Sequence, residues 1–386
     1  MGTRVNAGDA GTLGGRGREG LARAAGWLRL GVAAGLLALI LHIIFCNEAQ
    51  LHLAATGRSW DALGKWDQRR LAWSRGPVEL WRTVQRLSPA HVALALASCG
   101  VPVVLGGLRW RRALQVQQLP IGVAEVLRVS FVAHFFNAFL LGSTGGDVVK
   151  AWCASRWTRE RRAEAALSVL VDRLVGTLAL LLFAVAMIPL AWRAPDGSPL
   201  FLNHRAYPAV AAVLAGMSAI ALVLVLGAFY TDWLAPGRAA SRALHRLPRG
   251  GSLARALAAC RLFGRHPRYV AESVAYSLAI NVAIVGTFLA IASGLGLEVP
   301  GRVLWFVVPA VVCVAALPIT PSGLGVREHL MVSLLALPEF PGVRHGEALA
   351  LALLAYSANL AWSAVGGVVY LAGPGGAGGT GPADPA

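Results

Sequence analysis

The stretch NAFLLGSTGGDVVK, residues 137–150, decides the fold of this chain. It places a run of small and hydroxyl residues, Gly142–Gly146, between an apolar run at 121–141 and a shorter segment at 147–155. Glycine is a poor helix former. Residues 121–155 therefore form either one broken crossing of a membrane or a hairpin that enters, breaks and returns. The arginines that flank this segment distinguish the two possibilities.

Two clusters of arginine flank the segment. They are Arg109, Arg111 and Arg112 before it, and Arg156, Arg159, Arg161 and Arg162 after it. A complete crossing would put the clusters on opposite sides, against the bias of Lys and Arg toward cytoplasmic loops. A hairpin leaves both clusters in the cytoplasm. We therefore expect a re-entrant hairpin, whose irregular backbone at membrane depth is buried in protein or lines a cavity.

The composition places the whole chain in a membrane. Of its 386 residues, 56% are apolar and 14% are charged, against roughly 45–50% and about 25% in soluble domains. The excess is gathered in long uncharged runs, among them 30–46, 174–192, 209–230 and 348–372. Several reach the ~20 residues that a helix needs to cross the hydrocarbon core. The expected fold class is an all-α polytopic membrane protein, and a series of soluble domains is excluded.

Cysteine spacing and charge exclude other classes. The five cysteines show no CxxC and no paired Cys/His spacing, which argues against a disulfide framework and a structural zinc site. The net charge is +16, and every basic residue except Lys65 and Lys150 is arginine. Much of this charge flanks apolar runs, so we assign it to cytoplasmic loops that face anionic lipid rather than to nucleic acid. We expect no metal and no cofactor.

About six crossings and two interrupted hairpins account for the chain. The expected crossings are 28–46, 90–108, 165–190, 208–230, 270–293 and 347–372. The second hairpin, 302–337, breaks at 318–325 and enters from the outside, opposite to the first, as in an inverted repeat. The loop at 231–268 holds eight arginines and Asp232 as its only acid, which places it in the cytoplasm.

The ends of the chain differ from its middle in composition. We expect residues 1–26 to be a disordered basic tail, 27–372 to be the membrane domain, and 373–386 to be a disordered Gly/Pro tail. The run at 28–46 is interpreted as an uncleaved signal-anchor rather than a cleaved signal peptide, because no small-x-small site follows it. Both termini then lie in the cytoplasm, and the protein belongs in the plasma (inner) membrane.

Segment 47–88 is mixed in character. Its four tryptophans recur near one side of a helix, which suits an amphipathic helix at the membrane interface. A small solvated helical loop explains the segment equally well. It carries seven basic and four acidic residues, an excess that conflicts with the outside position that the crossings give it.

Both breaks combine glycine and a hydroxyl residue with an acid and a base in the next helical turn. The second break ends in PSGLGVRE, residues 321–328. In the first, Thr144 and Asp147 have the spacing of a helix N-cap. A helix that begins there directs free N–H groups and its positive dipole end into the membrane, which makes an anion site, and Lys150 reaches the same anion. No Gly-Lys-Ser/Thr follows, so a soluble phosphate loop is excluded.

The glycines have a second possible reason, because they also let helices pack closely or kink. Two interrupted segments at corresponding places in two halves of a chain favour a binding site. We therefore interpret both breaks as parts of one site.

Asp172 and Arg173 lie inside an apolar run, where ionisable residues are functional candidates. One helix face is shared by Glu164, Ser168, Asp172 and Gly176. Arg173 points about 100° away from Asp172, so the two need separate partners. The expected pairs are Asp172 with Lys150 or Arg327, and Arg173 with Asp147 or Glu328. The alternative is an interfacial pair that only fixes the helix register.

Weaker polar stripes run along other helices. They comprise Ser130, His134 and Asn137; Ser273, Ser277 and Asn281; and Tyr356, Asn359, Ser363 and Gly366. Hydrogen bonds between spans explain these residues as well as a substrate path does. No ligand at helical spacing joins His134, so a metal site is not expected there.

The candidate substrate-binding residues are Asn137, Gly145, Gly146, Asp147, Lys150, Asp172, Arg173, Ser322, Gly323, Gly325, Arg327 and Glu328. The amides of the four glycines, with the two cations Lys150 and Arg327, are expected to hold a phosphate. The three acids and Arg173 are expected to exchange partners as the two halves rock. No residue is assigned a catalytic or metal-binding role.

These motifs resemble a known family. The matching residues are Asn137, GSTGGD at 142–147 with the base Lys150, the pair Asp172–Arg173, and PSGLGVRE at 321–328. They are similar to the lysylphosphatidylglycerol synthase transmembrane-region family, also called the flippase-like domain, and to the membrane half of the bacterial multiple peptide resistance factor. The resemblance covers roughly residues 28–372. Members often have proline where Leu141 stands and arginine where Lys150 stands.

The resemblance implies a protein of several spans that binds lipid headgroups or moves them across the bilayer. In the larger resistance factors a soluble aminoacyl-transferase domain follows the membrane part. This chain reaches Ala386 through a Gly/Pro tail, so lysyl transfer is expected to be absent.

Three functions stay open from the sequence. The leading hypothesis is a lipid translocase, not an enzyme, whose partners are membrane lipids with an anionic or lipid-linked phosphate headgroup, bound near the bilayer midplane. The second is an intramembrane enzyme that acts on a lipid-linked substrate through acid–base or metal chemistry. The third is a scaffold that binds a partner through the 231–268 loop. The lipid, the direction, the energy source and the oligomeric state do not follow from the sequence.

Overall fold

The computed structural model describes residues 56–119, 121–138, 145–157, 161–194, 196–234, 260–317, 326–340 and 345–372, with residues 42, 45, 46, 49, 50, 53 and 343. This part of the chain is helical and contains no strand, apart from one isolated bridge between Arg193 and Pro199. The elements are η1 (Trp60–Ala62), α2 (Lys65–Arg86), α3 (Pro89–Val116), α4 (Val123–Asn137), α5 (Gly145–Trp157), α6 (Arg162–Ala186), η3 (Ile188–Ala191), α7 (Leu200–Asn203), α8 (Ala206–Leu234), α11 (Pro267–Gly294), α12 (Gly301–Ala315), α13 (Val326–Leu335) and α14 (His345–Ala372).

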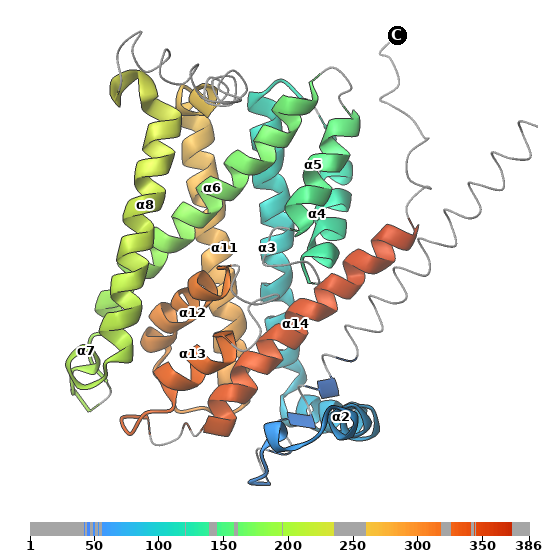
Figure 1. Ribbon diagram of the computed structural model, residues 1–386, viewed down its shortest axis with the longest axis vertical. Coiled ribbons are helices and arrows are strands. Elements are labelled where there is room, and N and C mark those ends of the chain that lie inside the picture. Colours follow the sequence, from blue (N-terminus) through green and yellow to red (C-terminus); the bar gives the residue numbers. More distant parts are fainter. Residues whose placement is uncertain are drawn as a thin grey trace, which may run out of the picture.

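Five of these helices are long and apolar enough to cross a membrane. They are α3, α6 with the following η3, α8, α11 and α14, and they correspond to five of the expected crossings (Figure 1). The remaining expected crossing, 28–46, lies almost wholly outside the described residues. The protein is thus an all-helical polytopic membrane protein, as the composition predicts.

Two helical hairpins enter the bundle from opposite ends (Figure 1). Helices α4 and α5 pack side by side at the end where α3 finishes, and α12 and α13 pack together at the other end. With 15, 13, 15 and 10 residues, all four are shorter than the ~20 residues of a span. The expected pair of oppositely directed hairpins is confirmed. The breaks themselves, 139–144 and 318–325, lie outside the described residues.

The two ends of the bundle differ in charge. An ion pair between Arg112 Nε and Glu272 Oε2, 3.1 Å long, joins the end of α3 to the start of α11, so both arginine-rich helix ends lie at one end of the molecule. Helix α2 lies at the opposite end and is seen end-on in Figure 1, across the direction of the spans. Its side chains Trp66 and Trp73 are exposed, as an interfacial helix requires. Which end faces the cytoplasm stays a prediction.

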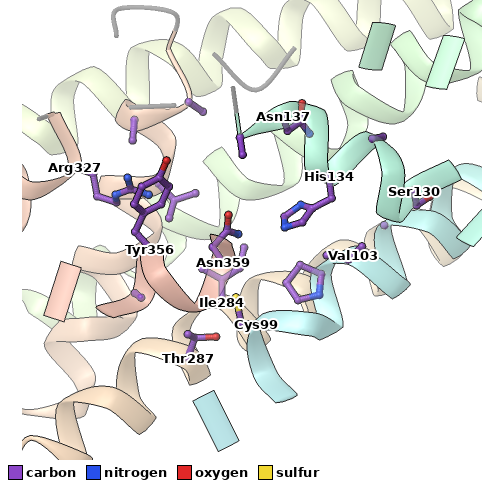
Figure 2. A pocket seen from close by; sticks show the side chains of 18 of the residues that line it. Cys99, Val103, Ser130, His134, Asn137, Ile284, Thr287, Arg327, Tyr356 and Asn359 are labelled. Atoms are coloured by element: carbon purple, nitrogen blue, oxygen red, sulfur yellow. The ribbon is translucent and has the colours of Figure 1, made fainter. Parts of the chain in front are cut away.

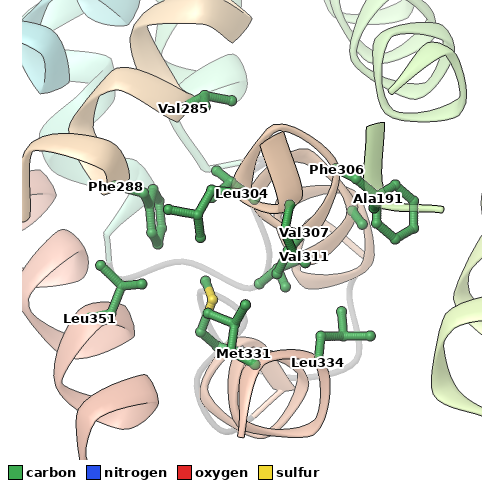
Figure 3. Packing of buried hydrophobic residues seen from close by; sticks show 14 of the residues in the cluster. Ala191, Val285, Phe288, Leu304, Phe306, Val307, Val311, Met331, Leu334 and Leu351 are labelled. Carbon is green, nitrogen blue, oxygen red and sulfur yellow. The ribbon is translucent and has the colours of Figure 1, made fainter. Parts of the chain in front are cut away.

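The exposure of apolar side chains distinguishes the interior hairpin from helices that face lipid. Helix α12 is apolar on all sides, and Figure 3 shows its Val307 and Val311 packed between Phe288 of α11 and Met331 of α13. In contrast, α8 leaves Val223 exposed with the other large side chains of its outer face. A helix that is apolar all round is either buried or in contact with lipid. Helix α12 is the buried case, and α8 is the case with a face available to lipid.

Polar contacts fasten the second hairpin to the helices beside it. Tyr207 Oη donates a hydrogen bond to the Leu334 carbonyl at 2.8 Å. His204 Nε2 lies 2.7 Å from Glu339 Oε2 in the loop after α13. Burial acts to raise the pKa of Glu339, but hydrogen bonds to the carboxylate, the largest from His204, together with the charge of His204 hold this pKa below its ordinary value.

Gly366 brings α14 directly onto α4. A Cβ atom at this position would fall on the carbonyl oxygen of Phe131. One turn earlier, Ser363 Oγ donates a hydrogen bond to the His134 carbonyl at 3.0 Å. Small residues allow such close contact between helices in a membrane. Ser363 and Gly366 of the predicted α14 stripe therefore have a packing role.

Gly366→Ala is expected to destabilise the protein by about 1–3 kcal/mol, because the new methyl group overpacks the contact between the two helices. Thermal unfolding in detergent, followed by intrinsic fluorescence, measures the effect. The matched control is Gly216→Ala on the exposed face of α8, where a Cβ meets nothing within 4 Å. Equal melting temperatures for the two variants would contradict the close packing of α14 on α4.

Candidate functional site

A cavity of about 400 Å³ is lined by residues of both hairpins. Asn137 and Ala138 at the end of α4, Ala315 and Ala316 at the end of α12, and Arg327 near the start of α13 all line it. Both breaks are therefore connected to the same cavity through the residues that flank them. This arrangement brings the described residues that flank the two breaks to one place, and the interpretation of the breaks as one binding site stays a prediction.

The cavity wall combines polar side chains with an apolar lining. Its polar residues are Ser130, His134 and Asn137 of α4, Lys150 of α5, Thr287 of α11, Arg327 of α13, and Tyr356 and Asn359 of α14. Figure 2 shows His134 and Arg327 on opposite sides, with Tyr356 and Asn359 between them. Residues from each of the predicted stripes on α4 and α14 thus reach the cavity.

The start of α5 is held by the end of α4. Asn137 Oδ1 accepts a hydrogen bond from the Gly146 amide at 2.6 Å. A Cβ on Gly146 would meet the Ala133 carbonyl and the Asn137 side chain, so only glycine permits this contact. The sequence predicted Thr144 as the cap, and Thr144 lies outside the described residues. The Gly146 amide, expected to bind an anion, is occupied by Asn137 in this arrangement.

Lys150 faces the cavity without a carboxylate partner in the described part of the chain. Its Nζ lies 5.2 Å from the ring centroid of Trp110. The indole Nε1 of Trp110 in turn donates to Ser168 Oγ at 3.1 Å. Lys150 is therefore positioned by an aromatic face, and its charge stays available to an anion.

Arg327 is the second cation of the cavity. Its Nε lies 3.4 Å from Glu328 Oε1, and its guanidinium carbon lies 4.1 Å from the ring centroid of Tyr356. The side chain is 14% exposed. Its Nη2 is buried and has no hydrogen-bond partner among the described residues. A buried donor without a partner is uncommon and costly, and a ligand oxygen would satisfy it.

Asp172 pairs with a residue that the sequence analysis assigned elsewhere. Its carboxylate accepts two hydrogen bonds from Arg109, at 2.7 Å from Nε and 3.3 Å from Nη2. Arg109 Nη1 also donates to Ser277 Oγ of α11 at 2.8 Å. The expected pairing of Asp172 with Lys150 or Arg327 is therefore wrong. Grouping Arg109 with Arg111 and Arg112 as a loop cluster hid its position inside α3.

One glycine in the sequence could have indicated where the Arg109 side chain packs. Gly176 lies one turn from Asp172 on the predicted face, and a Cβ there would come 2.5 Å from Arg109 Nη2. Ser168, one turn earlier, accepts the hydrogen bond from Trp110. The face formed by Ser168, Asp172 and Gly176 is thus the docking surface for two neighbouring side chains of α3.

Arg173 pairs with Asp147, one of its two expected partners. The distance between Arg173 Nε and Asp147 Oδ2 is 3.7 Å, and both side chains are partly exposed. This contact joins α6 to the first turn of α5. The other expected partner, Glu328, lies beside Arg327 on α13 instead.

His134 is a cavity residue that the sequence analysis treated as one of a polar stripe. Its Nε2 is buried and makes no hydrogen bond with any described residue. The ring points into the cavity toward Asn359 (Figure 2). The 3.6-residue period placed His134 on the same face as Asn137, but could not show that this face lines a cavity.

Three of the predicted binding residues, Ser322, Gly323 and Gly325, lie outside the described residues, and Gly145 is buried at the start of α5. Within the described ranges no group of three His, Cys, Asp or Glu side chains could hold a metal ion.

Comparison with known families identifies a match over most of the chain. The family model described as "Lysylphosphatidylglycerol synthase TM region" matches residues 69–366. The matched range includes both hairpins, the cavity and the Arg109–Asp172 pair. No curated protein matches the chain.

Asp172→Asn is expected to destabilise the protein by about 3–5 kcal/mol, because it leaves the buried Arg109 charge without its counter-ion. Chemical or thermal unfolding in detergent measures the loss. The double variant Arg109→Met with Asp172→Leu should recover most of it, since apolar replacement of a buried pair is often neutral.

The control is Glu125→Gln, which breaks a partly exposed pair with Arg128 on α4 and should cost no more than about 1 kcal/mol. If Asp172→Asn were as stable as this control, the Arg109–Asp172 pair would not hold the helices together.

Proposed function

The chain belongs to the lysylphosphatidylglycerol synthase TM-region family, and on this premise we propose that it binds the phosphate headgroup of a membrane lipid between its two hairpins and carries it across the bilayer. The observation that carries the proposal is the cavity in which Lys150 of the first hairpin and Arg327 of the second both take part. One cation comes from each of two oppositely directed hairpins, so a phosphate between them would contact both halves of the protein.

The charges around the cavity favour a phosphate. The buried and partly buried cations Arg109, Lys150, Arg173 and Arg327 outnumber the carboxylates Asp147, Asp172 and Glu328 by one. Arg109 and Arg173 are matched by Asp172 and Asp147, which leaves Lys150 as the excess charge. An uncompensated cation in a membrane interior is costly unless an anion joins it. A lipid phosphate supplies that anion.

The size and lining of the cavity suit a headgroup. Its volume of about 400 Å³ falls in the usual range of small-molecule sites. Apolar residues such as Pro102, Ile284 and Phe288 line it beside the polar groups. A phospholipid or a polyprenyl phosphate can therefore place its phosphate on the cations and its carbon chain along the apolar wall.

The contacts of the hairpins suggest how the site changes access. The Arg109–Asp172 pair is buried and bidentate and holds α3 and α6 together. The Arg173–Asp147 contact is longer and partly exposed, so α5 can separate from α6 at a smaller cost. A phosphate on Arg327 would compete with Glu328 for the same guanidinium. Movement of α4–α5 against α12–α13 would then open the cavity to alternate sides.

The proposed role is binding and translocation rather than catalysis. Each carboxylate near the cavity in the described part of the chain is engaged by an arginine, which leaves none of these placed as a general base. We place the protein in the plasma (inner) membrane with both termini in the cytoplasm.

Lys150→Gln and Arg327→Gln are each expected to weaken lipid binding roughly ten- to a hundredfold, since a hydrogen bond to a charged group contributes about 1.5–3 kcal/mol. Titration with short-chain phosphatidylglycerol or polyprenyl phosphate, followed by native mass spectrometry, measures binding. Reduction of fluorescent lipids by dithionite in proteoliposomes measures translocation.

Arg193→Gln serves as the control, because Arg193 is exposed and does not line the cavity. It should bind and translocate as the unmodified protein does. If the two cavity variants matched this control with both lipids, the phosphate would not bind at Lys150 and Arg327.

A further inference from the structure

One ring nitrogen on the cavity wall takes no part in the proposed binding of phosphate. Nε2 of His134 is buried and makes no hydrogen bond with any described residue. The ring points into the cavity from the last turn of α4 (Figure 2). Buried polar atoms of folded proteins nearly always have a hydrogen-bond partner. A group that enters the cavity is therefore the candidate partner of this atom.

The contact of the ring with α14 fixes the hydrogen-bonding role of Nε2. The His134 ring forms a hydrogen bond with the backbone of Asn359. Inside a helix the amide N–H is already used by the backbone ladder, so the ring meets the carbonyl oxygen, which can only accept. Because Nε2 has no partner among the described residues, Nδ1 is the atom that donates. A neutral imidazole with its proton on Nδ1 has a lone pair on Nε2, which makes Nε2 an acceptor.

The cations of the cavity favour the neutral ring. A second proton would make His134 a third cation on a wall that already holds Lys150 and Arg327. The Lys150 charge acts on the ring, and like charges at membrane depth are costly. Nε2 of the neutral ring requires a hydrogen-bond donor rather than an anion.

The neighbouring donors of the wall do not satisfy Nε2. Ser130 Oγ and Thr287 Oγ1 each donate to a backbone carbonyl of their own helix, at 2.8 and 3.1 Å. The Lys150 ammonium lies over an indole ring. Arg327 lies on the opposite side of the cavity from His134 (Figure 2). These four side chains leave Nε2 to a donor that comes with the ligand.

The phosphate of a bound lipid cannot be that donor. An ionised phosphodiester offers acceptor oxygens and carries no hydrogen to donate. In the proposed binding mode its charge is shared between Lys150 and Arg327. The part of the headgroup that follows the phosphate can carry a hydroxyl or ammonium group, and this part is the one that can satisfy His134.

We propose that His134 is a specificity-determining residue of this cavity, whose Nε2 accepts a hydrogen bond from a hydroxyl or ammonium group that the headgroup carries beyond its phosphate. The inference rests on the proposed function, because it names the substrate class of the same site. Headgroups with such a donor, among them glycerol and ethanolamine, bind more tightly than headgroups that end in methyl groups, such as choline.

The selection depends on the cost of a hydrogen bond that is not made. A site built to hydrogen-bond one group of a substrate rejects an analogue without that group, because a buried polar atom of the site then stays unpaired. Apolar side chains such as Ile284 and Phe288 line the same cavity. They offer Nε2 no alternative partner when the headgroup lacks a donor.

The test uses two pairs of lipids with identical acyl chains, measured by native mass spectrometry of the full-length protein. Phosphatidylglycerol and phosphatidylmethanol have the same net charge and differ in their hydroxyl groups. Phosphatidylethanolamine and phosphatidylcholine also have the same net charge and differ in their N–H donors. We expect the donor lipid of each pair to bind at least about tenfold more tightly than its partner. Phosphatidylmethanol has the smaller headgroup of its pair, so its weaker binding cannot come from steric exclusion.

Substitutions of His134 assign the preference to Nε2. His134→Phe removes the acceptor and should reduce both ratios to about one, and His134→Leu does the same with a smaller side chain if the first variant does not fold. His134→Gln keeps an acceptor and should retain a preference of several-fold. The matched control is His266→Phe, because His266 is exposed just before α11 and does not line the cavity. It should leave both ratios unchanged.

The outcomes separate this inference from the proposed function. Equal binding within both pairs would overturn the role of His134 and leave the proposed function standing. Preferences that persisted in His134→Phe and His134→Leu would also overturn it, since the donor would then contact another residue. Absence of binding by all four lipids would overturn the proposed function as well.

Discussion

The ion pair between Arg109 and Asp172 is the interaction on which the site depends. Two buried charges are tolerated in a membrane only when each is matched and hydrogen-bonded. Here the bidentate pair and the bond to Ser277 meet that condition and connect α3, α6 and α11. Gly176 leaves the space that the guanidinium needs. The first hairpin packs against two of these three helices, α4 on α3 and α5 on α6.

The positive charge of the cavity follows from this pairing. Because Asp172 is paired with Arg109, it forms no direct ion pair with Lys150. Asp147 pairs with Arg173. The Lys150 ammonium lies over the ring of Trp110, the residue that follows Arg109 in the sequence. The second hairpin adds Arg327 from the opposite side. The proposed anion site thus lies beside a network in which the neighbouring carboxylates are paired with arginines.

The architecture could be predicted from the sequence because run length, charge distribution and helical period are properties of whole segments. Apolar run length and the distribution of arginine predicted both hairpins and their opposite directions, and the period of the helix predicted the faces of α4 and α6. The side chains that contact one another in the fold were harder to predict from the sequence. Arg109 lies two residues from Arg111, and a rule that counts charges near membrane boundaries cannot tell a loop arginine from one inside the span.

The contact between Asn137 and Gly146 shows the same limit. The sequence predicted Thr144 as a local cap. The oxygen that accepts the hydrogen bond from the Gly146 amide is Oδ1 of Asn137, nine residues earlier at the end of the preceding arm. His134 was visible as a polar residue on one helix face, but only the packing of α3, α11, α12, α13 and α14 makes a cavity there. Local spacing identifies candidates, and the convergence of helices from distant parts of the chain decides which of them meet.

The most direct measurement is an electron cryomicroscopy structure of the protein in nanodiscs that contain phosphatidylglycerol. The account predicts headgroup density in the cavity, with the phosphate within hydrogen-bonding distance of both the Lys150 ammonium and the Arg327 guanidinium. A structure with ordered lipid around the helices, but with the cavity closed and Lys150 paired to Asp147 or Asp172, would contradict it.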